Sequence, residues 1–227
     1  MKNLDKKVSK YYKSFDNKLN YSVPNETIFR ILGNNKIKFK KKNVLDIGIG
    51  NGDNLLEFKR RKANIFGVDI RRKITKIFVN KNNLKIENFF CCDLNYNFPK
   101  INKKIDLVLC KDTLYYLTKN RQFILFDEID KILKKNGYFL IQYIQAQLIK
   151  KSKGKFLSFN LNKKSDYKEQ KKYFEKNNPL PFLHEKHIIK LIKSKNFTLR
   201  NSVFDINTHI KNKKTYIIIN RFLLLQK

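Results

Sequence analysis

Cysteine and histidine are scarce, with three of each in the 227-residue chain. Three cysteines, of which Cys91 and Cys92 are adjacent, do not make a disulfide framework. Three histidines cannot supply the ligand spacing of a zinc site, so no bound metal is expected. These shortages favour a reduced, cytoplasmic protein.

Long apolar runs are missing as well. The most apolar stretch, YIIINRFLLL, is interrupted by Asn220 and Arg221 and is too short to cross a bilayer. The N-terminal segment carries a charge every few residues and has no apolar run typical of a secretory signal. The sequence therefore predicts neither a membrane span nor a signal peptide.

Acidic residues are few, 19 against 51 lysines and arginines, which gives a formal net charge of +32. Such an excess of positive charge suggests nucleic acid or another anionic surface as a binding partner. The lysines are spread along the whole chain, and abundant Lys, Asn and Ile are expected from an AT-rich genome. Genome bias does not explain the shortage of acids, so an anionic partner stays open as an alternative.

Glycine is also rare, but three of the seven glycines alternate within the stretch VLDIGIGNGDN, at Gly48, Gly50 and Gly52. They follow a buried apolar run that ends in Asp46. A phosphate-binding loop would end in Gly-Lys-Ser/Thr, which is absent. The dinucleotide fingerprint requires a glycine at its sixth position, where Asp53 stands. The loop is therefore of a third kind.

Strand and helix patterns alternate through the middle of the chain. The apolar periodicity predicts strands at 43–48, 64–70, 84–93, 104–112 and 138–145 and helices at 52–62 and 71–82. Leu125, Ile129, Ile132 and Leu133 predict the apolar face of a third helix, which stops at Asn136-Gly137. Repeated strand–helix units of this length predict a parallel sheet covered on both faces. A further helix at 184–195 and two β-rich stretches at 197–210 and 214–227 predict a terminal antiparallel pair.

The pattern D-x-G-x-G-x-G, from Asp46 to Gly52, resembles motif I of the class I S-adenosylmethionine-dependent methyltransferases. Further residues stand in the order that this family shows. Asp69 ends the second strand, Asp93 follows the third, and the segment IDLVLCKDTLYYL fits the fourth strand and its polar loop. The resemblance covers about residues 40–145 well and the C-terminal part more loosely.

The resemblance implies an α/β, Rossmann-like, doubly wound fold. Its sheet would be mostly parallel and seven-stranded, with a terminal antiparallel strand and helices on both faces. A single domain over residues 1–227 would consist of an N-terminal lid (1–40), a cofactor-binding core (41–145), a substrate insert (146–183) and a C-terminal helix and β-hairpin (184–227).

S-adenosyl-L-methionine is the cofactor that the resemblance implies. Asp69 would hold both ribose hydroxyls, Asp93 would face the adenine amino group, and Asp46 would order the loop or a water near the cofactor's amino group. The glycines would let the backbone pass beneath the ligand, because side chains there would fill the site. The implied cofactor contacts are Asp46, Gly48, Ile49, Gly50, Gly52, Asp69, Ile70, Cys92, Asp93, Leu94 and Lys111.

Three residues are candidates for catalysis. Lys111 and Asp112 end the fourth strand and could act as base or clamp, with a solvated loop pair as the alternative. His184 begins a helix, where capping is the alternative to a base. Tyr21, Tyr115 and Tyr116 are candidate substrate contacts, although one of the adjacent tyrosines is expected in the core.

The acceptor is the least determined part of the prediction. Amino methylation of DNA bases normally uses Asn/Asp/Ser-Pro-Pro-aromatic, but KDTLYY stands there, from Lys111 to Tyr116. The expected reaction moves a methyl group to an O (or N) nucleophile of a small molecule, such as a sugar or a surface-polysaccharide precursor. RNA methylation and a non-catalytic cofactor-binding protein are the alternatives, and the expected assembly is a monomer or homodimer.

Overall fold

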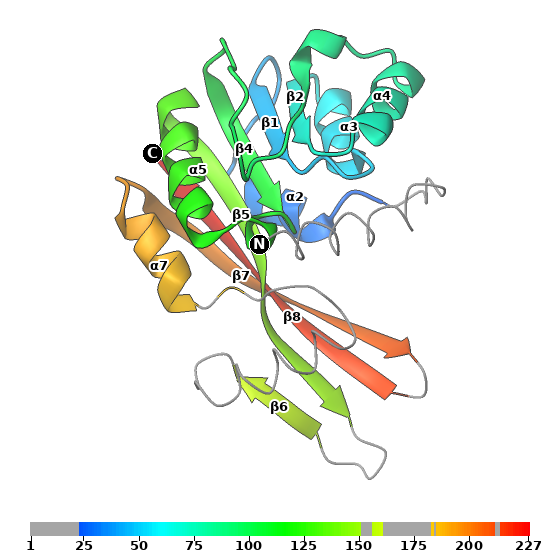
Figure 1. The fold of residues 1–227 in the computed structure, drawn as a ribbon, viewed down its shortest axis with the longest axis vertical. Coiled ribbons are helices and arrows are strands. Elements are labelled where there is room, and N and C mark those ends of the chain that lie inside the picture. The colour runs from blue at the N-terminus through cyan, green and yellow to red at the C-terminus, as the bar shows by residue number, and fades with distance from the viewer. Residues whose placement is uncertain (1–22, 151–155, 161–182, 184, 212–213) are drawn as a thin grey trace.

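The computed structural model describes residues 23–150, 156–160, 183, 185–211 and 214–227. One sheet of eight strands forms its centre, in the order β3-β2-β1-β4-β5-β8-β7, with β6 paired to β5 (Figure 1). The strands are β1 (Asn43–Ile47), β2 (Asn64–Asp69), β3 (Phe89–Cys91), β4 (Ile105–Lys111), β5 (Leu133–Lys150), β6 (Phe156–Asn160), β7 (Thr198–Lys211) and β8 (Lys214–Gln226).

Strands β1 to β5 pair in parallel, whereas β8 runs antiparallel between β5 and β7. The expected doubly wound sheet with a terminal antiparallel strand is therefore confirmed. Strand β6 is an addition that lies within the expected substrate insert and pairs antiparallel with the far end of β5. Figure 1 shows β5, β7 and β8 continuing well beyond the helices.

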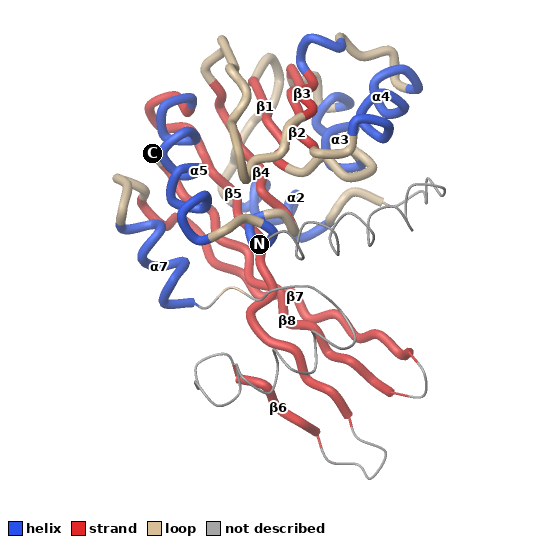
Figure 2. Tube along the Cα trace, viewed as in Figure 1, coloured by secondary structure: helices blue, strands red, loops and turns tan. Residues whose placement is uncertain are grey.

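Helices cover both faces of the sheet (Figure 2). They are α2 (Glu26–Asn34), α3 (Asp53–Arg60), α4 (Arg72–Lys81), α5 (Lys119–Ile132) and α7 (Glu185–Lys193), with short 3₁₀ turns η1 (Ile86–Asn88) and η2 (Leu114–Tyr116). Side chains of α2, α3 and α4 share one buried cluster, and those of α5 and α7 share the other. Within the described ranges, no helix is long and apolar enough to span a membrane.

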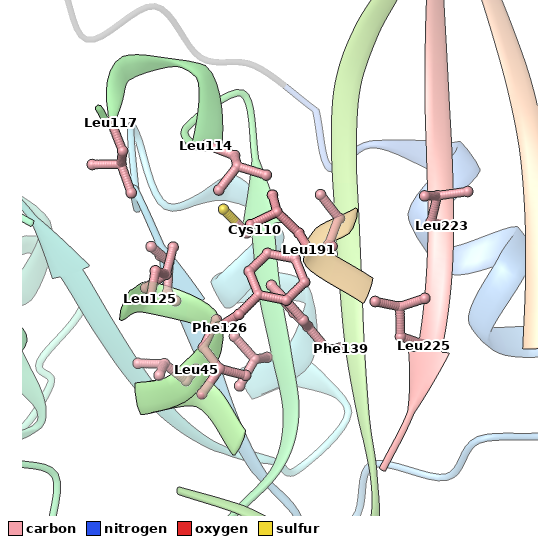
Figure 3. Close-up of a cluster of buried hydrophobic side chains, with 14 of the residues drawn as sticks. Leu45, Cys110, Leu114, Leu117, Leu125, Phe126, Phe139, Leu191, Leu223 and Leu225 are labelled. Carbon is pink, nitrogen blue, oxygen red and sulfur yellow. The ribbon is translucent and has the colours of Figure 1, made fainter. Parts of the chain in front are cut away.

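The strand β4 explains why the central strands have continuous apolar sequences. Val108 and Cys110 belong to the cluster under α5, whereas Leu107 and Leu109 belong to the cluster on the opposite face. Successive side chains of a strand point to opposite faces, so a strand that is covered on both sides must be apolar at every position. Figure 3 shows Cys110 among the leucines and phenylalanines of the first cluster.

Three elements have bounds that differ from the sequence prediction. Strand β5 continues to Lys150, beyond the expected end at 145, because β8 pairs with it over that length. Helix α5 ends at Ile132 and not near Asn136, because Leu133 already pairs with Ile105 as the irregular start of β5. Strand β3 begins only at Phe89, since the preceding residues form the η1 turn. The helix and strand propensities of the residues at these boundaries do not predict them, because each boundary depends on pairing with a distant strand.

Asp106 joins three strands at the amino end of the sheet. Its carboxylate accepts a hydrogen bond from the Asn43 amide (2.9 Å) and forms ion pairs with Lys134 (2.8 Å) and Lys42 (3.3 Å). Partial burial works to raise the pKa of Asp106, but the bonds from Lys134, Asn43 and Lys42 outweigh it and hold the pKa below 3.8. This end of β4 is therefore a structural and not a catalytic position.

We expect Asp106→Asn to lower the free energy of unfolding by roughly 1.5–3 kcal/mol, since it weakens charge-assisted bonds to a half-buried carboxylate. The folded-state pKa is depressed, so the stabilisation is complete above the unfolded-state pKa of 3.8 and is lost as the pH falls through the lower folded value. Urea denaturation across this range measures it. Glu128→Gln, which removes an exposed ion pair with Lys131, should change the free energy of unfolding much less, because solvent screens the pair. Equal losses in the two variants would contradict the assignment.

Candidate functional site

A cavity of about 960 Å³ opens at the carboxyl ends of β1, β2 and β4. This edge is where ligands bind in open α/β sheets. Its walls come from the loop after β1, the ends of β2, β3 and β4, the start of α2 and part of β7. The residues that define its two ends are Val23, Glu26, Thr27, Asp205 and Asn207 on one side, and Ile70, Cys92, Asp93, Leu94 and Tyr96 on the other.

The glycine loop folds back onto β2. The amides of Gly48 and Ile49 both donate to the Val68 carbonyl, at 2.7 and 3.2 Å. The three alternating glycines have φ values of 83°, 59° and 82°. This left-handed conformation is rarely adopted by other residues, so the turn itself selects glycine.

The three glycines differ in what a side chain would meet. A β-carbon at Gly48 would collide with the Thr113 side chain, and one at Gly52 would collide with the Phe78 ring. At Gly50 the nearest atom is 3.9 Å away, on Arg71. Only Gly50 therefore leaves open space in the cavity. Gly52 is not among the cavity-lining residues and instead begins α3.

Asp69 ends β2 with a carboxylate that is only 6% exposed. One oxygen accepts from the Gly50 amide (2.9 Å), and the other accepts from the amide and Nε of Arg71 (2.9 and 3.1 Å). A buried carboxylate needs such partners, because desolvation alone would be costly. Asp69 thereby fixes the glycine loop against β2. Sequence reasoning missed Arg71, whose only signal was a basic residue two positions after the acid.

Asp46 lies at the base of the cavity and is 2% exposed. Burial raises the pKa of this carboxyl to about 7; the charge of Lys111 lowers it and that of Asp69 raises it further. No hydrogen bond from the described residues reaches its side chain. A buried carboxyl group without a partner, facing a cavity, favours a cationic ligand group.

The turn after β4 brings two further charged side chains into the cavity. Asp112 has a left-handed φ of 53°, which is uncommon for a residue other than glycine. Its amide donates to the Gln142 side chain (2.8 Å), and its carboxylate pairs with Lys111 and accepts from the Tyr115 hydroxyl (3.1 Å). Gln142 is 2% exposed and also donates to Asn220 (2.8 Å). Gln142 thus supports the turn from β5.

The loop after β3 forms the opposite wall. Asp93 accepts a hydrogen bond from the Asn95 amide (2.8 Å), and Asn95 in turn accepts from the Thr118 amide (3.0 Å). Burial raises the pKa of the Cys92 thiol to about 11, so this side chain is neutral and contributes an apolar surface with Leu94. The wall combines one carboxylate with apolar groups, which suits a flat heterocycle with an exocyclic amine.

A profile of the methyltransferase domain family matches residues 38–186. The chain belongs to this family. The resemblance inferred from the glycine loop is therefore confirmed. The match includes the whole parallel part of the sheet and the cavity-lining loops of β1 to β4.

Individual proteins are similar to this chain over shorter stretches or at low identity. An uncharacterized protein of Rickettsia prowazekii (strain Madrid E) is 28% identical over 127 residues, which span 52% of this chain and 48% of that protein. Magnesium protoporphyrin IX methyltransferase from Synechocystis PCC 6803, with bound S-adenosylhomocysteine, superposes with a TM-score of 0.60 at 16% identity, covering 89% of this chain and 80% of its own. A putative methyltransferase from Bacillus halodurans C-125 superposes with a TM-score of 0.65 at 12% identity. The superposition covers 88% of this chain and 97% of that protein's chain. At these identities the solved structures support the fold alone.

The remaining candidates fall into three groups. Tyr116 and the half-exposed Ile70 line the cavity of the methyltransferase. Tyr115 is 5% exposed and is not a lining residue, so it acts through its hydroxyl bond to Asp112. Tyr21 and His184 lie outside the described residues. Within the described chain, no three His, Cys, Asp or Glu side chains gather as metal ligands would.

We expect Gly48→Ala to destabilise the protein by roughly 1–3 kcal/mol, because the new methyl group overlaps Thr113 in a left-handed backbone. Thermal and urea denaturation measure the change. Gly33→Ala is the matched control, since no atom lies within 4 Å of a β-carbon there and the helix should gain up to about 1 kcal/mol. If Gly48→Ala is as stable as wild type, the described packing of the loop is wrong.

Proposed function

We propose that this methyltransferase moves the methyl group of S-adenosyl-L-methionine to an O or N nucleophile of a small acceptor. One observation carries the proposal. A single cavity brings the carboxylates of Asp46, Asp69 and Asp93 around the glycine loop and places the Lys111–Asp112 pair beside them. The three carboxylates suit the ammonium, ribose hydroxyl and adenine amino groups of the cofactor. The Lys111–Asp112 pair would lie where an acceptor approaches the methyl group.

The residues present fit the cofactor. Asp46 would receive its ammonium group, because this buried carboxyl lacks a hydrogen-bonding partner among the described residues. Asp69 would receive the ribose hydroxyls and share its oxygens with Arg71. Asp93 would face the adenine amino group, with Cys92 beside the ring. When bound, the cofactor supplies a methyl group on a sulfonium, which is already a good leaving group.

The protein's contribution to the reaction is alignment and proton removal. Holding the acceptor in line with the methyl group can contribute roughly 7–11 kcal/mol. A base adds typically about 10²–10⁴-fold. Asp112 is the candidate base, since its carboxylate faces the cavity and is oriented by Lys111 and Tyr115. Lys111 would then stabilise the carboxylate before it takes the proton.

A small acceptor, such as a sugar or a surface-polysaccharide precursor, is supported by the cavity volume of about 960 Å³, which suits a small ligand beside the cofactor. The start of α2 contributes Val23 to Thr27 to its wall, which agrees with a lid formed by residues 1–40. RNA is the second candidate because of the net charge of +32. Methyl-donor consumption with total RNA, and separately with nucleotide-linked sugars and small metabolites, distinguishes them. The free cysteines Cys91, Cys92 and Cys110 suit a reducing compartment such as the cytoplasm.

Calorimetry should detect binding of S-adenosylhomocysteine and none of NAD. Below about pH 7 the buried carboxyl of Asp46 holds a proton that must leave when an ammonium group binds beside it. Affinity for S-adenosylhomocysteine should therefore rise by about tenfold per pH unit up to pH 7 and level off above it. Asp46→Asn should bind more weakly and lose this pH dependence. Binding of NAD alone would refute the proposed cofactor, and a pH-independent wild type would refute the role of Asp46.

Removing the charged pair should slow transfer more than it weakens cofactor binding. With an acceptor found in the screen, we expect Asp112→Ala to lower kcat by roughly 10²-fold or more and Lys111→Ala to have a smaller effect in the same direction. Affinity for S-adenosylhomocysteine should fall less than kcat does in both variants. Lys103→Ala, an exposed lysine just before β4, is the control for loss of a positive charge. Unchanged kcat in Asp112→Ala would exclude this residue as the base.

A further inference from the structure

The cavity extends past the residues assigned to the cofactor. Its volume of about 960 Å³ is at the upper end for a single drug-sized ligand, roughly 300–1,000 Å³. The additional space lies between the start of α2, with Glu26, and the strand β7, with Asp205 and Asn207. This part of the cavity, called here the acceptor end, meets the cofactor end at Lys111 and Asp112.

A row of polar side chains runs across the sheet from the Asp112 turn to Asp205. The Asp112 amide donates to Gln142 on β5, and Gln142 donates to Asn220 on β8. Asn220 is paired in the sheet with Asp205 on β7. Neighbouring residues Leu140, Phe222 and Leu224 belong to the cluster beneath α2, so strand alternation puts Gln142, Asn220 and Asp205 on that same face. Of this row, Asp112 and Asp205 line the cavity, whereas Gln142 and Asn220 connect their strands within the sheet.

The side chains that line the cavity are mostly acidic, whereas the chain as a whole is basic. Among the described residues that line the cavity, seven are acidic and two are basic, although the chain carries a net charge of +32. The two basic residues are already engaged, Lys111 with Asp112 and Arg71 with Asp69. Glu26 and Asp205 have no cationic partner in the described part of the chain, and the polar contact of Asp205 is with Asn207 (3.2 Å). Unpaired carboxylates lining a concave surface attract cations.

A second observation shows that the cavity is built to receive positive charge. Asp46, 2% exposed, faces the same space without a hydrogen bond from the described residues. The ammonium of the cofactor accounts for Asp46 but does not account for Glu26 and Asp205, which lie at the acceptor end. Those two carboxylates, of which Glu26 is exposed and Asp205 partly buried, are left over for a second ligand.

We infer that the acceptor carries a cationic amine, which Asp205 binds together with Glu26 at the acceptor end. The inference rests on the proposed function, since it concerns the second substrate of the same cavity. Asn207 supports the assignment by donating its side-chain amide to Asp205 and so orienting the carboxylate. An anionic acceptor would face repulsion from both carboxylates, with no free cation among the described lining residues to offset it.

Two probes of equal length and opposite charge test this inference. Putrescine carries two ammonium groups on four carbons, and succinate carries two carboxylates on the same length. Each is titrated by calorimetry and NMR into the full chain saturated with S-adenosylhomocysteine, at low salt. We expect putrescine to bind and succinate not to bind, which is the reverse of what the net charge of +32 favours for non-specific association.

Variants assign the binding to the acceptor end. Asp205→Asn, and separately Glu26→Gln, should weaken putrescine binding by about tenfold or more while leaving S-adenosylhomocysteine affinity within about twofold. Glu87→Gln removes an exposed carboxylate of η1 outside the cavity and should change neither. Two separate variants guard against misfolding of one of them, and circular dichroism verifies each fold.

The outcomes separate the inference from the proposed function. If S-adenosylhomocysteine binds but succinate binds as well as putrescine, or putrescine does not bind, the cationic acceptor is wrong and the methyltransferase reading stands. Putrescine binding that neither Asp205→Asn nor Glu26→Gln weakens also overturns the inference. Failure of S-adenosylhomocysteine itself to bind removes the proposed function and the inference together.

Discussion

The buried carboxylate of Asp69 holds the site together. It accepts hydrogen bonds from the amide of Gly50 and the guanidinium of Arg71, and so joins the loop after β1 to the end of β2 beside the two backbone bonds to the Val68 carbonyl. A buried charge is tolerated only when such donors surround it, and removing one of them leaves the desolvation cost unbalanced. This connection fixes the left-handed glycine turn against β2 at the cavity wall.

The cavity and the molecular surface have opposite electrostatic characters. A chain with 51 basic and 19 acidic residues would be read as a partner for polyanions on composition alone. The described residues around the cavity are instead mostly acidic, and both cations among them are paired. Local charge next to a ligand outweighs distant charge, because salt screens interactions beyond about 10 Å. Net charge therefore says little about which substrate enters this site.

The antiparallel part of the sheet has a functional consequence beyond closing the fold. Gln142 on β5 holds the Asp112 turn by its amide, and Asn220 on β8 holds Gln142. Strand β7 then adds Asp205 to the cavity wall. The terminal strands thus continue the row of polar side chains that begins at the end of β4, and through Asp205 the C-terminal third of the chain contributes to the candidate site as well as to the core.

The sequence by itself determined the fold class, the glycine loop and the acids Asp46, Asp69 and Asp93, because these follow from local periodicity and from the order of motifs along the chain. Sequence reasoning assigned the glycines to the ligand, but the structure shows that Thr113 and Phe78 exclude side chains at two of the three. Gln142, Asn220 and Asp205 carried no sequence signal. The contacts that give them a role join residues 30 and 78 positions apart. Such contacts are created only when strands pair across the sheet, which is why tertiary structure alone decided the shape and charge of the acceptor end.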